Sequence, residues 1–183
     1  MYRFKKAEAA AEFEQIFRLN HAVFARELRQ YAADSSARLV DKFHDKNLYV
    51  IAVSDEEVVG MIAAHDRPPF SIVDRLPDPG VLEQFGRLIE VRLLAIDPAH
   101  RSGMVLAGLF LTLYQHVRTY DAVAISGRVE ECPMYHRLGF HDLGPPVRSG
   151  QAEFVPMVMP VADLARREPR WRRRLESVRG PMP

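Results

Sequence analysis

The sequence predicts a mixed α/β domain, in which helices pack on one central sheet, and three observations carry this prediction. Residues 48–54 and 58–66 are apolar and flank the turn DEE, which indicates a β-hairpin. Residues 88–96 are typical of a buried strand. Residues 103–118 carry apolar side chains at three- and four-residue spacing, as the core-facing side of a helix does.

The first half of the chain begins with a short predicted strand at residues 2–4. Residues 7–31 have a helical period that Asn20 interrupts, which predicts one or two helices. Residues 33–47 are polar and predict a loop before the hairpin. Four prolines and two glycines then exclude a long regular element between residues 67 and 86. We predict a long loop with one short helix there, and long loops of this kind are often functional.

The second half alternates strands and helices. The strand–helix–strand unit over residues 88–126 predicts a parallel crossover. Residues 130–139 predict a short helix that ends at Gly139, a residue type that favours the left-handed conformation of a helix C-cap. Two last strands are expected at residues 140–144 and 152–161. We therefore expect one domain over residues 1–160 and a basic helical tail over residues 161–183.

The composition excludes several classes of protein. A length of 183 residues and a net charge of +1 suit one domain and give no sign of a nucleic-acid partner. Cys132 is the only cysteine, which excludes an intramolecular disulfide and a cysteine-cluster metal site, so we predict no metal. We find no signal peptide and no apolar stretch of membrane-spanning length, and we expect a cytoplasmic protein.

The segment DPAHRSG, residues 97–103, is a candidate anion site between a strand and a helix. Backbone N–H groups and the helix dipole favour an anion at a helix N-terminus. Arg101 can add bidentate hydrogen bonds to a phosphate. An ordinary turn with an exposed arginine explains the same residues, so the turn alone does not decide between the two interpretations.

Two segments in order resemble the GNAT acyltransferase superfamily. VRLLAIDPAHRSGMVLAGL is similar to the family's strand and pyrophosphate-binding turn, and the segment from Tyr135 to Phe140 is similar to its Tyr-x-(x)-x-Gly-Phe segment. The resemblance covers about residues 48–158. It implies a mixed, mostly antiparallel sheet of six to seven strands flanked by helices, and an acyl-CoA or acetyl-CoA donor. The residues implied to contact the donor are Leu94, Ala95, Ile96, His100, Arg101, Ser102, Gly103, Met104, Val105 and Leu106.

The turn departs from the family's Arg/Gln-x-x-Gly-x-Gly/Ala pattern. Counted from Arg101, the glycine positions hold Met104 and Leu106. Glycine lets a backbone approach a phosphate closely, whereas these side chains crowd that approach. An acyl carrier protein, which bears the same pantetheine arm without the adenosine 3′-phosphate pyrophosphate, is therefore a second candidate donor. The arginines around Trp171 offer a basic surface to such an acidic protein, or form a solvated basic helix.

The N-terminal part resembles a narrower branch, the acyl-homoserine-lactone synthases and N-acyl amino acid synthases. FRLNHAVFARELRQY is similar to their Arg, Phe and Glu helix, and DKFHD to their Asp-x-x-Asp loop. Their Glu-x-Ser-Arg strand is matched here only in part, by EVRL. The resemblance implies that the acceptor amine meets Phe24, Asp41, Asp45 and Arg92. The two aspartates are equally consistent with solvated loop carboxylates.

Two residues are candidates for proton transfer during acyl transfer. Glu90 is the one acid on an apolar strand, and we predict that burial raises its pKa so that it acts as base, directly or through water. A pair with Arg92 or Arg87 at the sheet surface explains it equally well. The resemblance makes Tyr135 the acid that protonates the leaving thiolate, and packing of its ring on the core is the alternative.

The sequence therefore predicts an N-acyltransferase that moves an acyl group from acyl-CoA or acyl carrier protein to a small-molecule amine or amino acid. A plain acetyl-CoA-dependent N-acetyltransferase is the first alternative. A non-catalytic module that binds acyl thioesters or regulates another enzyme is the second.

Overall fold

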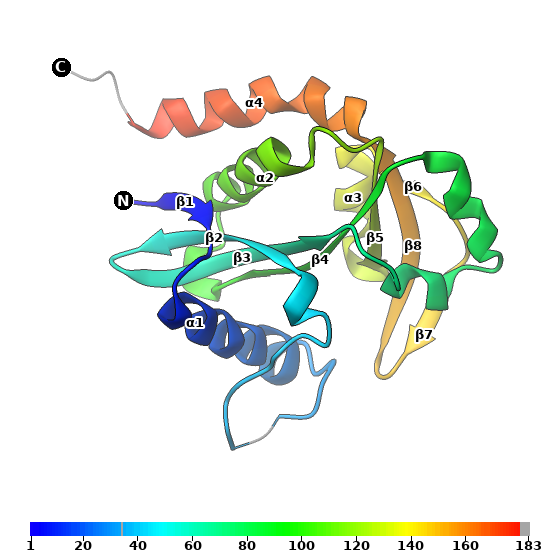
Figure 1. Ribbon diagram of the computed structural model, residues 1–183. Coiled ribbons are helices and arrows are strands. Elements are labelled where there is room, and N and C mark those ends of the chain that lie inside the picture. Colours follow the sequence, from blue (N-terminus) through cyan, green and yellow to red (C-terminus); the bar gives the residue numbers. More distant parts are fainter. Residues whose placement is uncertain (34, 180–183) are drawn as a thin grey trace.

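In the computed structural model, which describes residues 1–33 and 35–179, helices cover both faces of one eight-stranded sheet (Figure 1). The strand order is β1-β2-β3-β4-β5-β8-β6, and β7 also pairs with β8. Only β4 and β5 pair in parallel. The strands are β1 Arg3–Lys6, β2 Leu48–Ser54, β3 Glu57–His65, β4 Leu88–Ile96, β5 Ala122–Arg128, β6 His141–Asp142, β7 Val147–Ser149 and β8 Ala152–Pro160.

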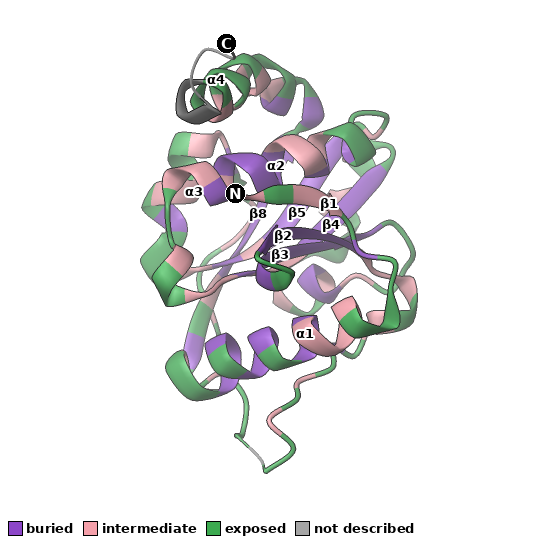
Figure 2. Cartoon of the chain, turned by 90° about the vertical axis from the view of Figure 1, so that its left-hand side faces the viewer, coloured by how far each residue is buried: buried purple, intermediate pink, exposed green. Residues whose placement is uncertain are grey.

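The helices form a layer on each side of the sheet. Helix α1 (Ala10–Asn20) lies on one face, and α2 (Gly103–Val117) lies on the other with α4 (Val161–Arg179) outside it (Figure 1). The short helix α3 (Cys132–Leu138) follows β5. Figure 2 shows the buried residues concentrated in the sheet and on the helix sides that face it. This is the burial pattern expected when a sheet packs on amphipathic helices.

The parallel pair β4–β5 is short, and its shortness opens the sheet. The two strands are in register only from Leu88 to Glu90, opposite Ala122 to Ala124. Beyond Glu90, β4 keeps β3 as its sole partner in the sheet, with a bulge that falls opposite the step from Met61 to Ala63. Leu93, inside this bulge, has a left-handed φ of 51°. A bulge bends its strand and changes the direction of the local backbone groups. Strand β4 therefore diverges from β5, and a gap opens between the two strands.

Most predicted elements are confirmed, with two differences. The sheet has eight strands rather than six or seven, because the short strand β7 also pairs with β8. The long loop holds two 3-10 helices rather than one, Ser71–Arg75 and Pro79–Phe85. Helix α1 ends at Asn20, where the sequence indicated an interruption, and the chain continues as a π-helix over His21–Glu27. Gly139 follows α3 with a left-handed φ of 95°, as predicted for a helix C-cap.

Helix α4 begins at Val161, the first residue of the predicted tail, and packs on α2. Val161 and Leu164 are buried in the same apolar cluster as α2, and the ring of Trp171 stacks on Phe110 with centroids 5.5 Å apart. Residues 161–179 therefore share the core of the sheet. The last four residues of the predicted tail lie outside the described part.

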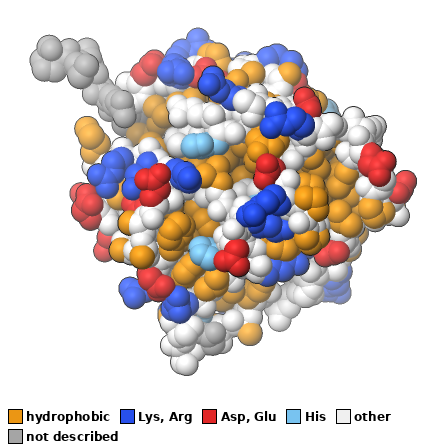
Figure 3. All heavy atoms as spheres, in the orientation of Figure 1, with side chains coloured by type: hydrophobic (Ala, Val, Ile, Leu, Met, Phe, Trp, Pro, Cys, Tyr) orange, Lys and Arg blue, Asp and Glu red, His pale blue; other side chains and the backbone are white. Residues whose placement is uncertain are grey.

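The surface seen in Figure 3 carries basic and acidic side chains interspersed among apolar ones. This matches the small net charge of +1. Among the described helices, none is long and apolar enough to cross a membrane.

Candidate active site

A cavity of about 470 Å³ occupies the gap where β4 and β5 separate. Small-molecule sites commonly have volumes of roughly 300–1,000 Å³ and mostly apolar walls. The walls come from the π-helix, the long loop, both strands, the turn after β4, α3 and the β7–β8 hairpin. The polar and charged lining residues are Glu27, Gln30, Tyr31, Ser71, Arg75, Arg92, Arg101, Ser126, Arg128, Glu131, Tyr135 and Ser149.

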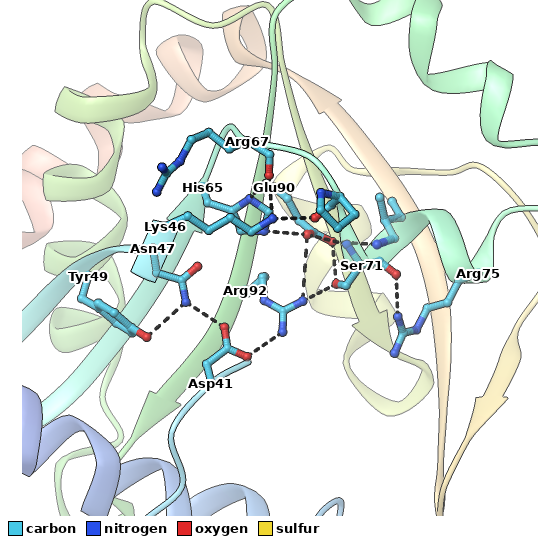
Figure 4. Close-up of polar contacts among 12 residues, drawn as sticks. Asp41, Lys46, Asn47, Tyr49, His65, Arg67, Ser71, Arg75, Glu90 and Arg92 are labelled. Carbon is cyan, nitrogen blue, oxygen red and sulfur yellow. Dashed lines mark hydrogen bonds and ion pairs between the residues drawn. The ribbon is translucent and has the colours of Figure 1, made fainter. Parts of the chain in front are cut away.

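Glu90 lies beside this cavity, in the last register pair of β4 and β5, with only 1 % of its surface exposed. Its Oε1 accepts hydrogen bonds from the hydroxyl of Ser71 (2.7 Å) and the N–H of Ile72 (2.8 Å). Its Oε2 accepts the N–H of Ser71 (2.8 Å) and lies 3.1 Å from Nε2 of His65 (Figure 4). This carboxylate therefore holds the first turn of the Ser71–Arg75 helix against the sheet.

The predicted direction of the Glu90 pKa is wrong. Burial raises the pKa of this carboxyl, but hydrogen bonds from His65 and Ser71 outweigh that effect and leave the pKa below its ordinary value. Hydrogen bonds to the charged form of an acid favour that form. Glu90 is thus a firmly ionised carboxylate, and the alternative pairing with Arg92 is present as a longer contact of 3.9 Å inside the protein rather than at its surface.

Arg92 and Asp41, both predicted to meet the acceptor, are paired with each other. Nη2 of Arg92 lies 2.9 Å from Oδ1 of Asp41, and Oδ2 of Asp41 accepts a hydrogen bond from Asn47 at 2.7 Å (Figure 4). Asp41 is buried, so it is not a solvated carboxylate. Nη1 of Arg92 donates to the hydroxyl of Ser71, and its guanidinium lies over the ring of Phe43. The guanidinium of Arg92 therefore joins the 41–47 loop to β4.

Asp45 is exposed and does not line the cavity. Its backbone oxygen accepts a hydrogen bond of 3.0 Å from Arg67. Asp45 thus helps to join the 41–47 loop to the loop that follows β3.

Arg101, in the turn after β4, is paired with a carboxylate, which the sequence did not suggest. Both terminal nitrogens of Arg101 bind the carboxylate of Glu27, at 2.7 and 2.5 Å, and Nε donates to the oxygen of Ile96 at 3.2 Å. The hydrogen bond from Arg101 is the main reason that the pKa of Glu27 is lowered. The guanidinium of Arg101, which we predicted would bind a phosphate through two hydrogen bonds, instead binds a carboxylate of the same chain.

The rest of the turn supports the helix that follows it. Ser102 is the N-cap of α2, and its hydroxyl accepts the N–H of Val105 at 3.3 Å. The guanidinium of Arg174, from α4, lies directly over Gly103, where any side chain would collide with it. Nδ1 of His100 lies 3.0 Å from the hydroxyl oxygen of Tyr2. Two basic groups, Arg101 and Arg174, thus flank the start of α2.

Tyr135 satisfies both interpretations that the sequence left open. Its ring packs over Gly127 and meets Phe140 edge-on, with centroids 5.8 Å apart. It also lines the cavity, and burial raises the pKa of its hydroxyl to about 12. A phenol with this pKa keeps its proton at neutral pH and is available as a donor.

The structure brings only some of the predicted residues to the cavity. Those that line it are Phe24, Arg92, Leu94, Ile96, Arg101, Leu106 and Tyr135. Those that do not are Asp41, Asp45, Glu90, Ala95, His100, Ser102, Gly103, Met104 and Val105. Residues on β4 alternate in direction along the strand, which accounts for Ala95. His100 contacts Tyr2 instead, and Ser102 caps α2, to which Gly103, Met104 and Val105 belong.

Sequence reasoning missed Ser71, Arg75, Ser126 and Arg128, which all line the cavity. Ser71 and Arg75 lie in the proline-rich loop, where no periodic pattern marks them. Ser126 and Arg128 lie at the end of β5, past its last register pair with β4, and the predicted strand–helix–strand unit ended at residue 126.

An antiparallel sheet with one short parallel pair, opened by a bulge and with one strand edge left open, is the sheet that the resemblance to the GNAT superfamily led us to expect. A family model described as "N-acyl amino acid synthase FeeM" matches residues 15–163. The chain belongs to this family and is an N-acyltransferase that acts on the amine of a small molecule. The expected class of enzyme is confirmed.

Solved structures with this fold include three kinds of protein. FeeM, an N-acyl amino acid synthase from uncultured soil microbes, superimposes with a TM-score of 0.70 at 20% identity, over 95% of this chain and 94% of that one. BjaI, a CoA-dependent acyl-homoserine lactone synthase, gives 0.72 at 18%, over 93% and 90%. A putative N-acetyltransferase from Lactobacillus plantarum gives 0.64 at 15%, over 87% and 98%. No match was found among curated protein sequences.

The Glu90 carboxylate yields a prediction about stability. In Glu90→Gln an amide NH2 replaces one oxygen and faces donors, so we expect the free energy of unfolding at pH 7 to fall by about 2–4 kcal/mol. Because the pKa of Glu90 is lowered on folding, its contribution is present above the ordinary value of 4.5 and is lost as pH falls below it. The variant and the parent should therefore converge in acid. Urea unfolding at pH 7 and pH 4 measures both effects.

Glu83→Gln is the matched control, because Glu83 is an exposed glutamate in the same loop. Its stability should stay within about 0.5 kcal/mol of the parent. A Glu90→Gln protein as stable as this control at pH 7 would contradict the assignment.

Proposed function

We propose that the chain transfers a fatty acyl group from a pantetheine thioester to the amino group of an amino acid. One observation carries the proposal: β4 beyond Glu90 has no β5 partner, so its backbone edge is open along a cavity of about 470 Å³. The amide groups of a pantetheine arm can pair with such an edge as an added strand does. The family description supports an amino acid as the acceptor.

The β4 bulge supplies a candidate oxyanion donor in this arrangement. Leu93 and Leu94 both line the cavity, and neither has a register partner on β3. A backbone N–H that is not used by the sheet can bind the oxygen that becomes negative when the amine attacks the thioester carbonyl. We assign this role to the bulge, and we assign the pairing with pantetheine to the strand residues Leu94, Ala95 and Ile96.

Tyr135 is the proposed acid in this reaction. Attack of the amine forms a tetrahedral intermediate, and its collapse breaks the carbon–sulfur bond and releases a thiolate. The phenol of Tyr135 gives that thiolate its proton, and the phenolate takes up the proton that the amine nitrogen loses, directly or through water, so that Tyr135 ends the cycle protonated. We assign Glu90 a positioning role rather than that of base, because its two oxygens already accept three hydrogen bonds and lie against the ring of His65. It holds Ser71 and, through it, Arg92 at the wall of the cavity.

Tyr135→Phe tests this assignment. We expect kcat to fall about 100-fold, as loss of a general acid does, while the KM of the amino acid changes little. Because the pKa of the Tyr135 hydroxyl is raised to about 12, no loss of parent activity from this group is expected between pH 6 and pH 9. Released thiol and N-acyl product, measured together, give the rate.

Tyr114→Phe is the control, since Tyr114 is also half-buried but lies on α2 away from the cavity lining. Thiol release without an N-acyl product would contradict acyl transfer to an amine. A preference for acetyl-CoA over longer donors would favour the plain N-acetyltransferase instead. No turnover, with thioester bound, would favour the non-catalytic module.

Of the two donors, the geometry favours an acyl carrier protein. Arg101 is already engaged by Glu27, and the side chains of Met104 and Leu106 occupy the positions where the family has glycine. A CoA pyrophosphate finds a poorer site at such a turn. Arg170 and Arg173 are exposed on α4, whose Arg174 lies over the turn, so an acidic carrier protein docked on α4 would place its pantetheine near the cavity mouth.

The double variant Arg170→Glu/Arg173→Glu tests the docking surface. We expect KM for an acylated carrier protein to rise at least about tenfold at low salt, through lost charge complementarity, and KM for the matching acyl-CoA to stay unchanged. Arg118→Glu, an exposed arginine at the end of α2, is the control for charge. Equal effects on both donors would remove α4 as a docking surface.

A further inference from the structure

Arg75 ends the first 3-10 helix of the long loop and lines the cavity. Its Nη1 donates to the oxygen of Ser71 at 2.9 Å, and its guanidinium lies over the ring of Phe154, on β8, at 4.8 Å from the centroid (Figure 4 shows the first contact). Ser71 in turn is bound by Glu90, so the orientation of Arg75 is fixed by the sheet through two hydrogen-bonded links.

The charge of Arg75 lacks a counter-ion within the described chain, unlike that of the other arginines in the cavity. Arg92 lies 2.9 Å from Asp41, Arg101 lies 2.5 Å from Glu27, and Arg128 lies 3.2 Å from Glu130. No carboxylate of residues 1–33 or 35–179 is within 4.0 Å of Arg75.

The Nε of Arg75 is also buried and has no hydrogen-bond partner in the described residues. Burial lowers the pKa of this guanidinium, although arginine stays charged at any physiological pH. A half-buried charge without a partner is costly, and buried charges in proteins are normally paired. The missing partner is therefore expected to arrive with a ligand.

Arg75 lies on the side of the cavity opposite the open edge of β4. Its guanidinium contacts the ring of Phe154 on β8, which is in register with Arg128 at the end of β5. The strand order β4-β5-β8 puts β8 on the far side of the gap from β4. In the proposed function the thioester arm lies along β4, so an anion bound at Arg75 would lie across the cavity from that arm, on the side left for the acceptor.

We propose that Arg75 binds the carboxylate of the acceptor amino acid and makes the enzyme select amino acids over simple amines. This inference rests on the proposed function. A guanidinium held over an aromatic ring can still present two of its N–H groups for a bidentate contact with a carboxylate. Lysine in its place keeps the charge but loses the planar fork and the stacking on Phe154. Arg75 is thus a specificity-determining residue and takes no part in proton transfer.

The test compares one amino acid with the amine that lacks only its carboxylate, using the same acyl donor. The parent enzyme should prefer the amino acid. In Arg75→Gln we expect KM for the amino acid to rise roughly 10- to 100-fold, as loss of a charged hydrogen bond does. KM for the matched amine and for the donor should stay within about twofold. Arg75→Lys should recover part of the loss.

Arg87→Gln is a closely matched control. Arg87 also donates from Nη1 to a backbone oxygen, that of Thr119 at 2.9 Å, and its guanidinium also lies over a ring, that of Tyr120 at 5.0 Å. It does not line the cavity. This variant should discriminate between the two acceptors as the parent does.

Three outcomes would overturn the inference. Equal loss of activity with both acceptors in Arg75→Gln would make Arg75 structural and leave acyl transfer standing. A change in KM for the donor alone would place Arg75 at the other substrate. Equal use of the amine and the amino acid by the parent would remove the proposed selectivity.

Absence of turnover under all conditions would count against the proposed function. A binding measurement keeps the inference about Arg75 testable in that case. Calorimetry then compares an N-dodecanoyl amino acid with the N-dodecanoyl amine that lacks its carboxylate. The inference predicts tighter binding of the first to the parent and equal binding of the two to Arg75→Gln. Equal binding of both to the parent would overturn it.

Discussion

The hydrogen bonds to the Glu90 carboxylate are the interaction on which the rest of the site depends. The group is buried at the last point where β4 and β5 are in register, and three donors from the long loop meet it there, beside His65 of β3. Ionised carboxylates are costly to bury unless they are paired and hydrogen-bonded. Here that requirement forces the loop after β3 to fold back on β4. The loop is then a fixed wall, with Ser71 and Arg75 held toward the cavity.

The separation of β4 from β5 is the second constraint, and it follows from backbone geometry. The bulge at Leu93 adds one residue to β4 against β3, and the strand bends away from β5. A parallel pair of only three residues leaves the opposite edge of β4 open. The cavity therefore lies between a wall set by a buried carboxylate and a strand edge exposed by a bulge.

Local patterns in the sequence were sufficient for most of the fold. The hairpin, the strand before the turn, helix α2 and the cap at Gly139 depend on periodicity and on glycine chemistry within a few residues. The short strand β7 was missed because three residues carry no measurable period, whereas β6 falls within the strand predicted at residues 140–144. The π-helix was missed because its apolar spacing resembles that of an α-helix.

The site was harder to predict because its contacts join residues far apart in the chain. Glu90 looked like a buried acid with a raised pKa, and the donors that lower it come from Ser71 and His65. Arg101 looked available for a phosphate, and its partner Glu27 is 74 residues away. Arg75 had no signal at all, since its significance lies in the missing counter-ion. The family resemblance identified the cavity wall but not these pairings.

Hydrogen exchange of the long loop tests the central claim most directly. The amides of Ser71 and Ile72 donate to a carboxylate that is 1 % exposed, so they should be protected to a degree similar to that of β4 itself. Amides of residues 80–84, in the second 3-10 helix of the same loop, should exchange much faster. Rapid exchange at Ser71 and Ile72, equal to that of residues 80–84, would contradict the account, because Glu90 would then not hold the loop in place.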